Sequence, residues 1–203
     1  MKPRILIVEI LVLLLLVLAG ATSAWAGPVW KLNGNTLKEA IPVQWKAGLA
    51  EVYFSDSTAG LSVSCGHATK YSVGPAAEGL IGELKLSSCK FAKEGNGSCD
   101  AGAPVTVQAS GLPWTTELYE EGGKVYGHIK AVHYTIECEI FKVLTFKDEC
   151  SGTLNALTIN VSSGVSWLLP LNRITCSTGG ANSGGIKLDD ILLSPKGSTL
   201  AVG

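Results

Sequence analysis

The sequence predicts an all-β fold: a single antiparallel β-sandwich stapled by disulfides, with a β-barrel as the alternative. Short runs in which apolar and polar residues alternate with a period of two favour strands, and no stretch keeps the i, i+3, i+4 apolar spacing of a helix. In addition, 24 of the 203 residues are glycines, which divide the alternating runs. Many short strands at intervals of roughly 8–12 residues are typical of sandwiches and barrels.

Residues 1–26 have the organisation of a secretory signal peptide. Two basic residues precede an apolar stretch over 5–18, and the small-x-small sequence Ala24-Trp25-Ala26 follows. A retained membrane anchor is the alternative, but Glu9 interrupts the apolar stretch, which is shorter than the ~20 residues that a spanning helix needs. We therefore expect cleavage after Ala26, secretion to the extracellular space, and one all-β domain over residues 27–203.

The alternating runs predict strands along the whole of this domain. Asn33-Gly34 and Glu121-Gly122-Gly123 have the composition of turns between paired strands, because Asn and Gly tolerate the positive φ angles of such turns. Glycine-rich or turn-rich sequences at 93–103 and 177–185 are expected to be loops. No change in composition marks a second domain. The expected strands cover residues 30–32, 36–37, 61–65, 83–87, 105–108, 115–120, 124–129, 140–146 and 186–188.

The stretch from Val125 to Cys138 predicts a β-bulge. Its apolar residues change phase between Ala131 and Val132, and a single extra residue there keeps one face apolar throughout. We interpret the opposite face as solvated and without a catalytic or metal-binding role, since an antiparallel sheet commonly has one solvent-exposed face. The alternative is a metal or acid–base trio of two histidines and Glu137. The polar face carries His128, Lys130, His133, Thr135 and Glu137.

All six cysteines lie in the predicted exported domain, where an even number predicts three structural disulfides. A metal site is disfavoured, because the sequence has no C-x-x-C pair and no Cys/His cluster at zinc-finger spacing. The intervening turn favours Cys89–Cys99, and a strand folding back on its predecessor favours Cys138–Cys150. The remaining pair is then Cys65–Cys176, although sequence alone leaves other pairings open.

Four short motifs follow one another over residues 28–152. They are Trp30-Lys31-Leu32-Asn33-Gly34, Ser64-Cys65, Gly82-x-Leu84-x-Leu86-x-x-Cys89 with Cys99 after it, and the pair Cys138 and Cys150. With these motifs in this order, the chain resembles a group of uncharacterised secreted proteins of soil actinobacteria. The resemblance implies an exported all-β domain and supplies no mechanism.

No group of residues predicts a catalytic, cofactor or metal site. The chain has three histidines and no Gly-x-Ser-x-Gly elbow. Adjacent carboxylates occur in three places, which we interpret as solvated strand ends because neighbouring strand residues point to opposite faces. These are Glu120-Glu121, Asp148-Glu149 and Asp189-Asp190. Trp114, at the exit of the loop Gly111-Leu112-Pro113, is the one ligand candidate, although such aromatics usually cover the core.

The charge of the domain disfavours nucleic acid as a partner. Without the signal peptide the chain has 14 basic and 16 acidic residues, whereas nucleic-acid binding needs a basic face. After signal cleavage we expect no membrane span and no cofactor. The function expected is a non-catalytic secreted or cell-surface binding or structural module with an unknown extracellular ligand or protein partner. A secreted hydrolase with an unrecognised site is the alternative, and convergence of His128, His133 and Glu137 in a pocket would favour it.

Cleavage after Ala26 predicts that the exported protein begins at Gly27, because signal peptidase reads the small residues that precede the cleaved bond. N-terminal sequencing of secreted material checks the position. Secreted protein that begins at Met1 would contradict it.

Overall fold

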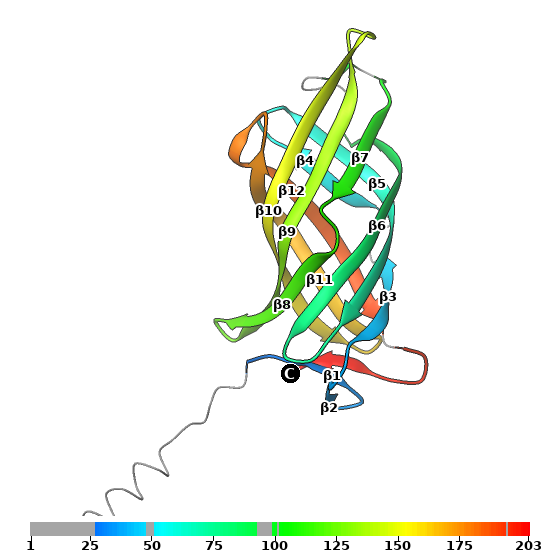
Figure 1. Cartoon of the computed structure of the whole chain (residues 1–203), viewed down its shortest axis with the longest axis vertical. Coiled ribbons are helices and arrows are strands. Elements are labelled where there is room, and N and C mark those ends of the chain that lie inside the picture. The colour runs from blue at the N-terminus through cyan, green and yellow to red at the C-terminus, as the bar shows by residue number, and fades with distance from the viewer. Residues whose placement is uncertain (1–26, 48–50, 93–98, 101, 194) are drawn as a thin grey trace, which may run out of the picture.

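The fold was described from a computed structural model, which covers residues 27–47, 51–92, 99–100, 102–193 and 195–203 (Figure 1). The expected signal peptide, residues 1–26, lies outside the described residues. Within the described ranges, no helix is long and apolar enough for a membrane crossing. The strands are β1 (Trp30–Leu32), β2 (Asn35–Thr36), β3 (Ile41–Ala47), β4 (Val52–Asp56), β5 (Leu61–Val73), β6 (Glu78–Phe91), β7 (Val105–Ser110), β8 (Trp114–Glu121), β9 (Lys124–Ile140), β10 (Leu144–Val161), β11 (Gly164–Cys176), β12 (Gly180–Leu193) and β13 (Leu200–Val202).

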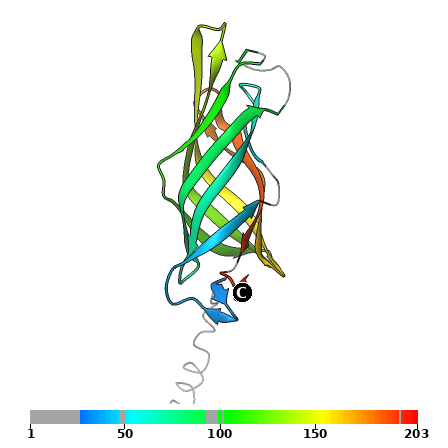
Figure 2. The ribbon, with the colours of Figure 1, turned by 90° about the vertical axis from the view of Figure 1, so that its right-hand side faces the viewer.

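The described residues form an all-β, antiparallel structure, which confirms the predicted fold class. Ten strands form one large sheet in the order β10-β11-β12-β3-β5-β6-β8-β9-β7, with β4 pairing with β12 and β5. A small sheet of β13, β1 and β2 lies across the lower end of the large one (Figures 1 and 2). The predicted turn at Asn33-Gly34 joins β1 to β2, and both residues have positive φ angles (52° and 81°).

The large sheet curls around the core, and its strands run obliquely around the long axis (Figure 2). Strand β9 pairs with β10 on one side and with β7 and β8 on the other. The circuit continues from β8 to β6, but this ladder covers only Glu78–Ile81 of β6. Beyond it β6 and β7 lie side by side, with no ladder between their described residues. A β-barrel, the alternative expectation, would require a sheet that is closed along its whole length. This sheet is not closed in that way.

The β-bulge predicted in β9 is confirmed. Val132 lies opposite Gly152 of β10, and Ile129 lies opposite Leu154, so two residues of β9 face one residue of β10. Ala131, one of the two, is exposed and has a φ of 56°. The extra residue brings the apolar positions on both sides of it to the inner face. The buried residues of this face include Ile129, Val132, Tyr134 and Ile136.

The lower part of the core is built around Trp167 of β11. Its ring lies 5.3 Å from that of Tyr71 and 6.5 Å from that of Trp30, the distances joining ring centroids. Gly127 of β9 faces the same indole, and a Cβ atom there would lie 2.9 Å from it. Trp30 comes from the small sheet, so this sheet closes the lower end of the core.

Two expected element boundaries are wrong. The run 140–146, expected to be one strand, contains the turn between β9 and β10, because Phe and Lys occupy turn positions at which sequence reasoning looks for Gly or Asn. The loop expected at 177–185 contains the start of β12. Glycine is needed there for packing, since a Cβ atom at Gly184 would lie 2.2 Å from Sγ of Cys176.

All six cysteines form disulfides, as expected, but the three expected pairs are wrong. The bonds are Cys65–Cys89, Cys99–Cys138 and Cys150–Cys176. The first joins β5 to β6, the last joins β10 to β11, and the second joins the segment before β7 to β9.

Strand register explains why the expected pair Cys138–Cys150 does not form. The β9–β10 ladder places Cys138 opposite Phe146 and Cys150 opposite Tyr134, so the two cysteines are several residues apart along the hairpin. Cys150 instead lies directly opposite Cys176 on its other neighbour, with their Cα atoms 4.0 Å apart.

The inner and outer faces of β9 should respond differently to truncation. Ile136→Ala should lower the free energy of unfolding by about 2–5 kcal/mol, because Ile136 is fully buried. Glu137→Ala, one residue away on the partly exposed face, should change it by less than about 0.5 kcal/mol. Urea denaturation measures both, and equal effects would contradict the assignment of faces.

Candidate functional site

The polar face of β9 brings no trio together, and it is only partly solvated. Lys130 is exposed, but Thr135, which lies opposite Gln108 of β7, is buried, so the expectation of a solvated face is wrong for this residue. His128 stacks on Tyr119, with ring centroids 3.9 Å apart, and lies opposite Asn155 of β10. His133 lies opposite Ser151 of the same strand. At about 3.3 Å per strand residue, the two histidines are more than about 10 Å apart. They are not among the described groups close enough to hold a metal ion.

Beside this face lies an open groove of about 470 Å³ at the turn between β5 and β6 and along β8. Its walls carry Ser72, Glu78, Thr115, Glu117 and Lys130 among other residues. The Lys130 ammonium forms an ion pair with Glu117, which lowers the pKa of that carboxyl. Because this lysine is already neutralised inside the groove, the groove offers no free cation for an anionic ligand.

Trp114 is not exposed, so the expectation that it is a surface ligand residue is wrong. Its side chain is 3% exposed, and its indole N–H donates to the carbonyl oxygen of Ser110 at 2.9 Å. The residue begins β8 in the inward phase, together with Thr116 and Leu118, which are also buried. Trp114 covers the core, as aromatic residues at such positions usually do.

Trp114 also lines an internal cavity of about 40 Å³, whose other walls are mostly apolar. A water molecule needs some 10–15 Å³ of such space, whereas ligand pockets are typically about 300–1,000 Å³. The cavity can therefore hold a few waters, and it is too small for an organic ligand.

A histidine–aspartate pair lies at this cavity. His67 of β5 and Asp190 of β12 are joined by a 2.8 Å contact between Nε2 and Oδ2, and their side chains are 3% and 0% exposed. The interpretation of Asp189-Asp190 as a solvated strand end is thus wrong for Asp190. Because neighbouring strand residues point to opposite faces, Asp190 is buried and the adjacent Asp189 is partly exposed.

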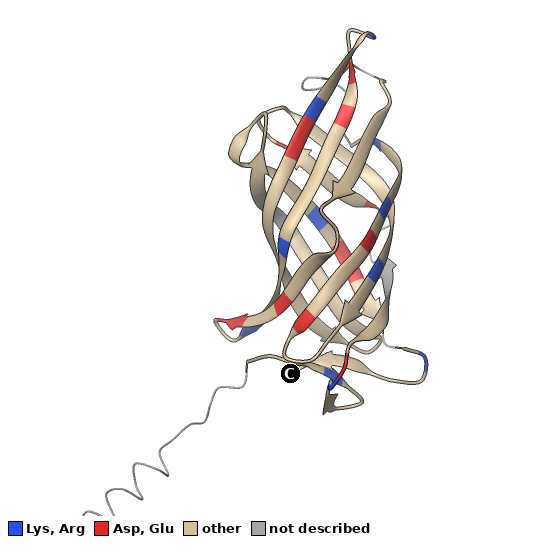
Figure 3. Cartoon of the chain, viewed as in Figure 1, with Lys and Arg blue, Asp and Glu red and all other residues tan. Residues whose placement is uncertain are grey.

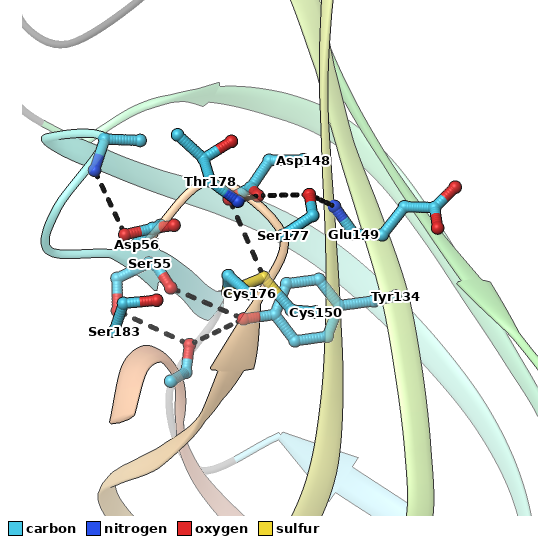
Figure 4. The surroundings of a disulfide bond; sticks show 12 residues. Ser55, Asp56, Tyr134, Asp148, Glu149, Cys150, Cys176, Ser177, Thr178 and Ser183 are labelled. Carbon is cyan, nitrogen blue, oxygen red and sulfur yellow. Dashed lines mark hydrogen bonds between the residues drawn. A yellow bond between two sulfur atoms is a disulfide. The ribbon is translucent and has the colours of Figure 1, made fainter. Parts of the chain in front are cut away.

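The same correction applies to Asp148-Glu149, since Asp148 is fully buried and Glu149 is exposed (Figure 4). Oδ1 of Asp148 accepts hydrogen bonds from the Ser177 hydroxyl and from the N–H of Thr178, both at 2.9 Å. The Asp148 carboxyl in turn faces the carboxyl of Asp56, which is also fully buried.

Asp56 ends β4 and turns the chain. Its Oδ1 accepts hydrogen bonds from the N–H groups of Thr58 (2.7 Å) and Ala59 (3.1 Å). Burial raises the pKa of Asp56, and the neighbouring carboxyl of Asp148 adds to the rise, against the lowering effect of the two N–H groups. The sequence does contain an indication of this burial, because Asp56 continues the alternation of Val52 and Phe54.

Asp148 does not form a metal site with its neighbours. Its carboxyl lies within 4.8 Å of the sulfur atoms of Cys150 and Cys176. A cysteine binds metal as a thiolate, however, and these two sulfurs are joined in a disulfide.

Among the residues whose burial the structure describes, the most exposed large apolar side chains lie at the tip of the β9–β10 hairpin, which projects beyond the rest of the sheet (Figure 1). Phe141 is 77% exposed, Val143 is 81% exposed and Leu144 is 59% exposed. We call these three residues and Lys142 the hairpin tip. Sequence reasoning missed it, because the run 140–146 alone does not distinguish an apolar turn from a buried strand.

The backbone of the hairpin tip is a tight turn. The N–H of Val143 donates to the carbonyl oxygen of Ile140 at 3.3 Å, and Phe141 and Lys142 between them have φ angles of 52° and 59°. Asn and Gly are the residues that this conformation favours, and other residues pay roughly 1–2 kcal/mol each. The side chain of Asp100 supports the turn by accepting from the N–H of Lys142 at 2.9 Å.

Comparison of the chain with protein-family models, curated sequences and solved structures finds no match.

The two adjacent aspartates of β12 provide a test of the buried pair. Asp190→Ala should lower the free energy of unfolding by about 1–3 kcal/mol or more, because it leaves the buried Nε2 of His67 without its acceptor. Asp189→Ala, on the opposite face, should change it by less than about 0.5 kcal/mol. Urea unfolding of both variants measures these changes. Similar losses of free energy in the two variants would contradict the assignment of Asp190 to the buried pair.

Proposed function

We propose that the protein is a non-catalytic extracellular binding module that contacts a lipid surface through its hairpin tip. The observation that carries the proposal is the concentration of exposed apolar side chains on this one projecting turn. Contiguous exposed apolar patches on soluble domains commonly mark interaction sites. Three disulfides support an extracellular location, because such bonds persist in oxidising compartments.

The conformation of the tip adds a second argument. Phe141 and Lys142 occupy turn positions that disfavour them, and Phe141 gains no burial there to offset the cost. Backbone strain of this kind is concentrated at functional sites. Burial of the Phe141 side chain in a partner would offset the cost of its backbone conformation and of its exposure to water.

The shape and size of the tip favour a lipid surface over a protein partner. The tip is a narrow turn that projects from the sheet, and three apolar side chains make up its patch. A stable protein interface buries about 1,200–2,000 Å² in total. Insertion into the interfacial region of a bilayer requires no matching groove and gains free energy from each apolar side chain that leaves water.

The charges near the tip predict which lipids it contacts. Lys142 lies at the turn, while acidic and basic positions are mixed on β9 and β10 below it (Figure 3). Glu139 lies opposite Thr145, and Glu137 lies opposite Lys147. The described residues around the tip form no basic cluster, and attraction to anionic lipids is weak without one. We therefore expect binding to neutral, zwitterionic vesicles with little dependence on salt.

The buried polar pairs support a non-catalytic role over the alternative of a secreted hydrolase. Asp56, Asp148 and Asp190 are fully buried, and a general acid or base must reach within hydrogen-bond distance of its substrate.

Vesicle sedimentation tests the proposal on the oxidised, exported protein. We expect it to bind phosphatidylcholine vesicles, and replacement of both Phe141 and Val143 by Ser should weaken binding by more than about tenfold, because two apolar side chains no longer leave water. The matched control replaces Leu80 and Ile159 by Ser, two partly exposed apolar residues outside the tip. This control should bind as the wild type does.

Several results would contradict the proposal. They are failure of the wild type to bind vesicles, equal losses in both double variants, or binding that requires phosphatidylserine and disappears in salt. Thermal unfolding of the variants should stay close to that of the wild type, since the substituted residues are exposed.

A further inference from the structure

The geometry points to a single proton shared between the buried carboxyls of Asp56 and Asp148, which we propose acts as an acid-dependent latch between the end of β4 and strand β10. This inference is independent of the proposed lipid contact.

The hydrogen-bond donors around the pair carry the argument. Each carboxyl has one oxygen satisfied: Oδ1 of Asp56 by two backbone N–H groups, and Oδ1 of Asp148 by a hydroxyl and an N–H. Oδ2 of Asp56 is buried and receives no hydrogen bond from any donor among the described residues. The neighbouring group that can supply a hydrogen is the Asp148 carboxyl itself. A proton held between the two carboxyls would satisfy this oxygen and remove the repulsion between two buried carboxylates.

The other groups packed around the pair do not replace this proton. Tyr134 of β9 donates toward the carbonyl oxygens of Gly185 (3.3 Å) and Ser55 (3.4 Å), and so away from the carboxyls. Sγ of Cys150 lies 3.8 Å from Oδ2 of Asp148, but a disulfide sulfur carries no hydrogen.

Charged side chains do not compensate the pair either. Among the described residues, neither Asp56 nor Asp148 forms an ion pair with a basic side chain. Lys147, the adjacent basic residue on β10, points to the outer face and pairs with Glu149 at 2.8 Å. The groups that face the pair from the β11–β12 turn are the uncharged Ser177 and Thr178, and Ser183 of β12 lies on the same side (Figure 4).

The direction of the pH dependence follows from the folded and unfolded states. Burial, together with the Asp148 carboxyl, raises the pKa of Asp56 above its ordinary value of 3.8. Above about pH 4 the unfolded chain releases a proton that the folded pair retains. The pair's contribution to stability is therefore complete in acid and is lost as the pH rises through the raised pKa, by up to about tenfold in the unfolding constant per pH unit.

The latch connects three parts of the fold. Asp56 ends β4, Asp148 belongs to β10, and the donors to Asp148 come from the turn between β11 and β12. Loss of the shared proton places two negative charges in contact in a buried site, and the ends of these strands are then driven apart. We expect this end of the sheet to be held in acid and loosened as the pH rises.

Asp148→Asn tests the latch directly. The amide oxygen can keep the bonds from Ser177 and Thr178, while the amide nitrogen donates permanently to Asp56 without a titrating proton. Urea unfolding from about pH 4 to about pH 8 should show the wild-type unfolding constant rising by about tenfold or more relative to that of the variant. The control Glu149→Gln, on the exposed neighbouring residue, should keep the wild-type pH profile.

Asp56→Asn, which offers the same donor from the other side, replaces Asp148→Asn if the latter does not fold. Carboxyl carbon NMR of the wild type gives an independent measurement, and the pair should then titrate in two separated steps. Identical pH profiles for wild type and Asn variant, or two carboxyls titrating near pH 4, would overturn the inference. So would stabilisation of the wild type by Ca²⁺ or Mg²⁺ near pH 8 that the Asn variant lacks, because the pair would then hold a cation.

Discussion

A single extra residue in β9 determines the direction of the side chains in the longest strand pair of the molecule. Because the bulge at Ala131 shifts the phase, Tyr134 and Ile136 point into the core and Glu137 points out. Strands β7, β8 and β10 all pair with β9, so their own inward faces follow from the same shift. The same shift places Tyr134 near the buried carboxyls (Figure 4).

The interior is mainly apolar, and among the described residues two buried pairs that contain aspartate join strands that are distant in sequence. His67 and Asp190 connect β5 to β12, and Asp56 and Asp148 connect β4 to β10. Burial of a charged group is costly unless it is paired or neutralised. In the first pair, a histidine is the partner of the buried aspartate. In the second pair, we infer that a shared proton neutralises one of the two carboxyls. Among the described residues, the large apolar side chains that are most exposed lie on the hairpin tip.

The sequence contained enough information for the fold class, the turn at Asn33-Gly34 and the bulge, because a period of two and its interruption are local properties. The disulfide pairs depend on register between strands, and one hairpin offset was sufficient to separate Cys138 from Cys150. Burial of Asp148 and Asp190 was missed for a related reason: adjacent carboxylates look solvated until the phase of a strand is known. The hairpin tip was missed because its residues contradict turn preferences.

The order of the disulfides along the chain has a consequence for biosynthesis. The three bonds close successive loops, 65–89, 99–138 and 150–176, and none encloses or crosses another. A chain that enters an oxidising compartment from its N-terminus presents each cysteine together with its partner before the next pair arrives. Each native bond can thus be made from the segment already delivered, and none has to be broken to allow a later one.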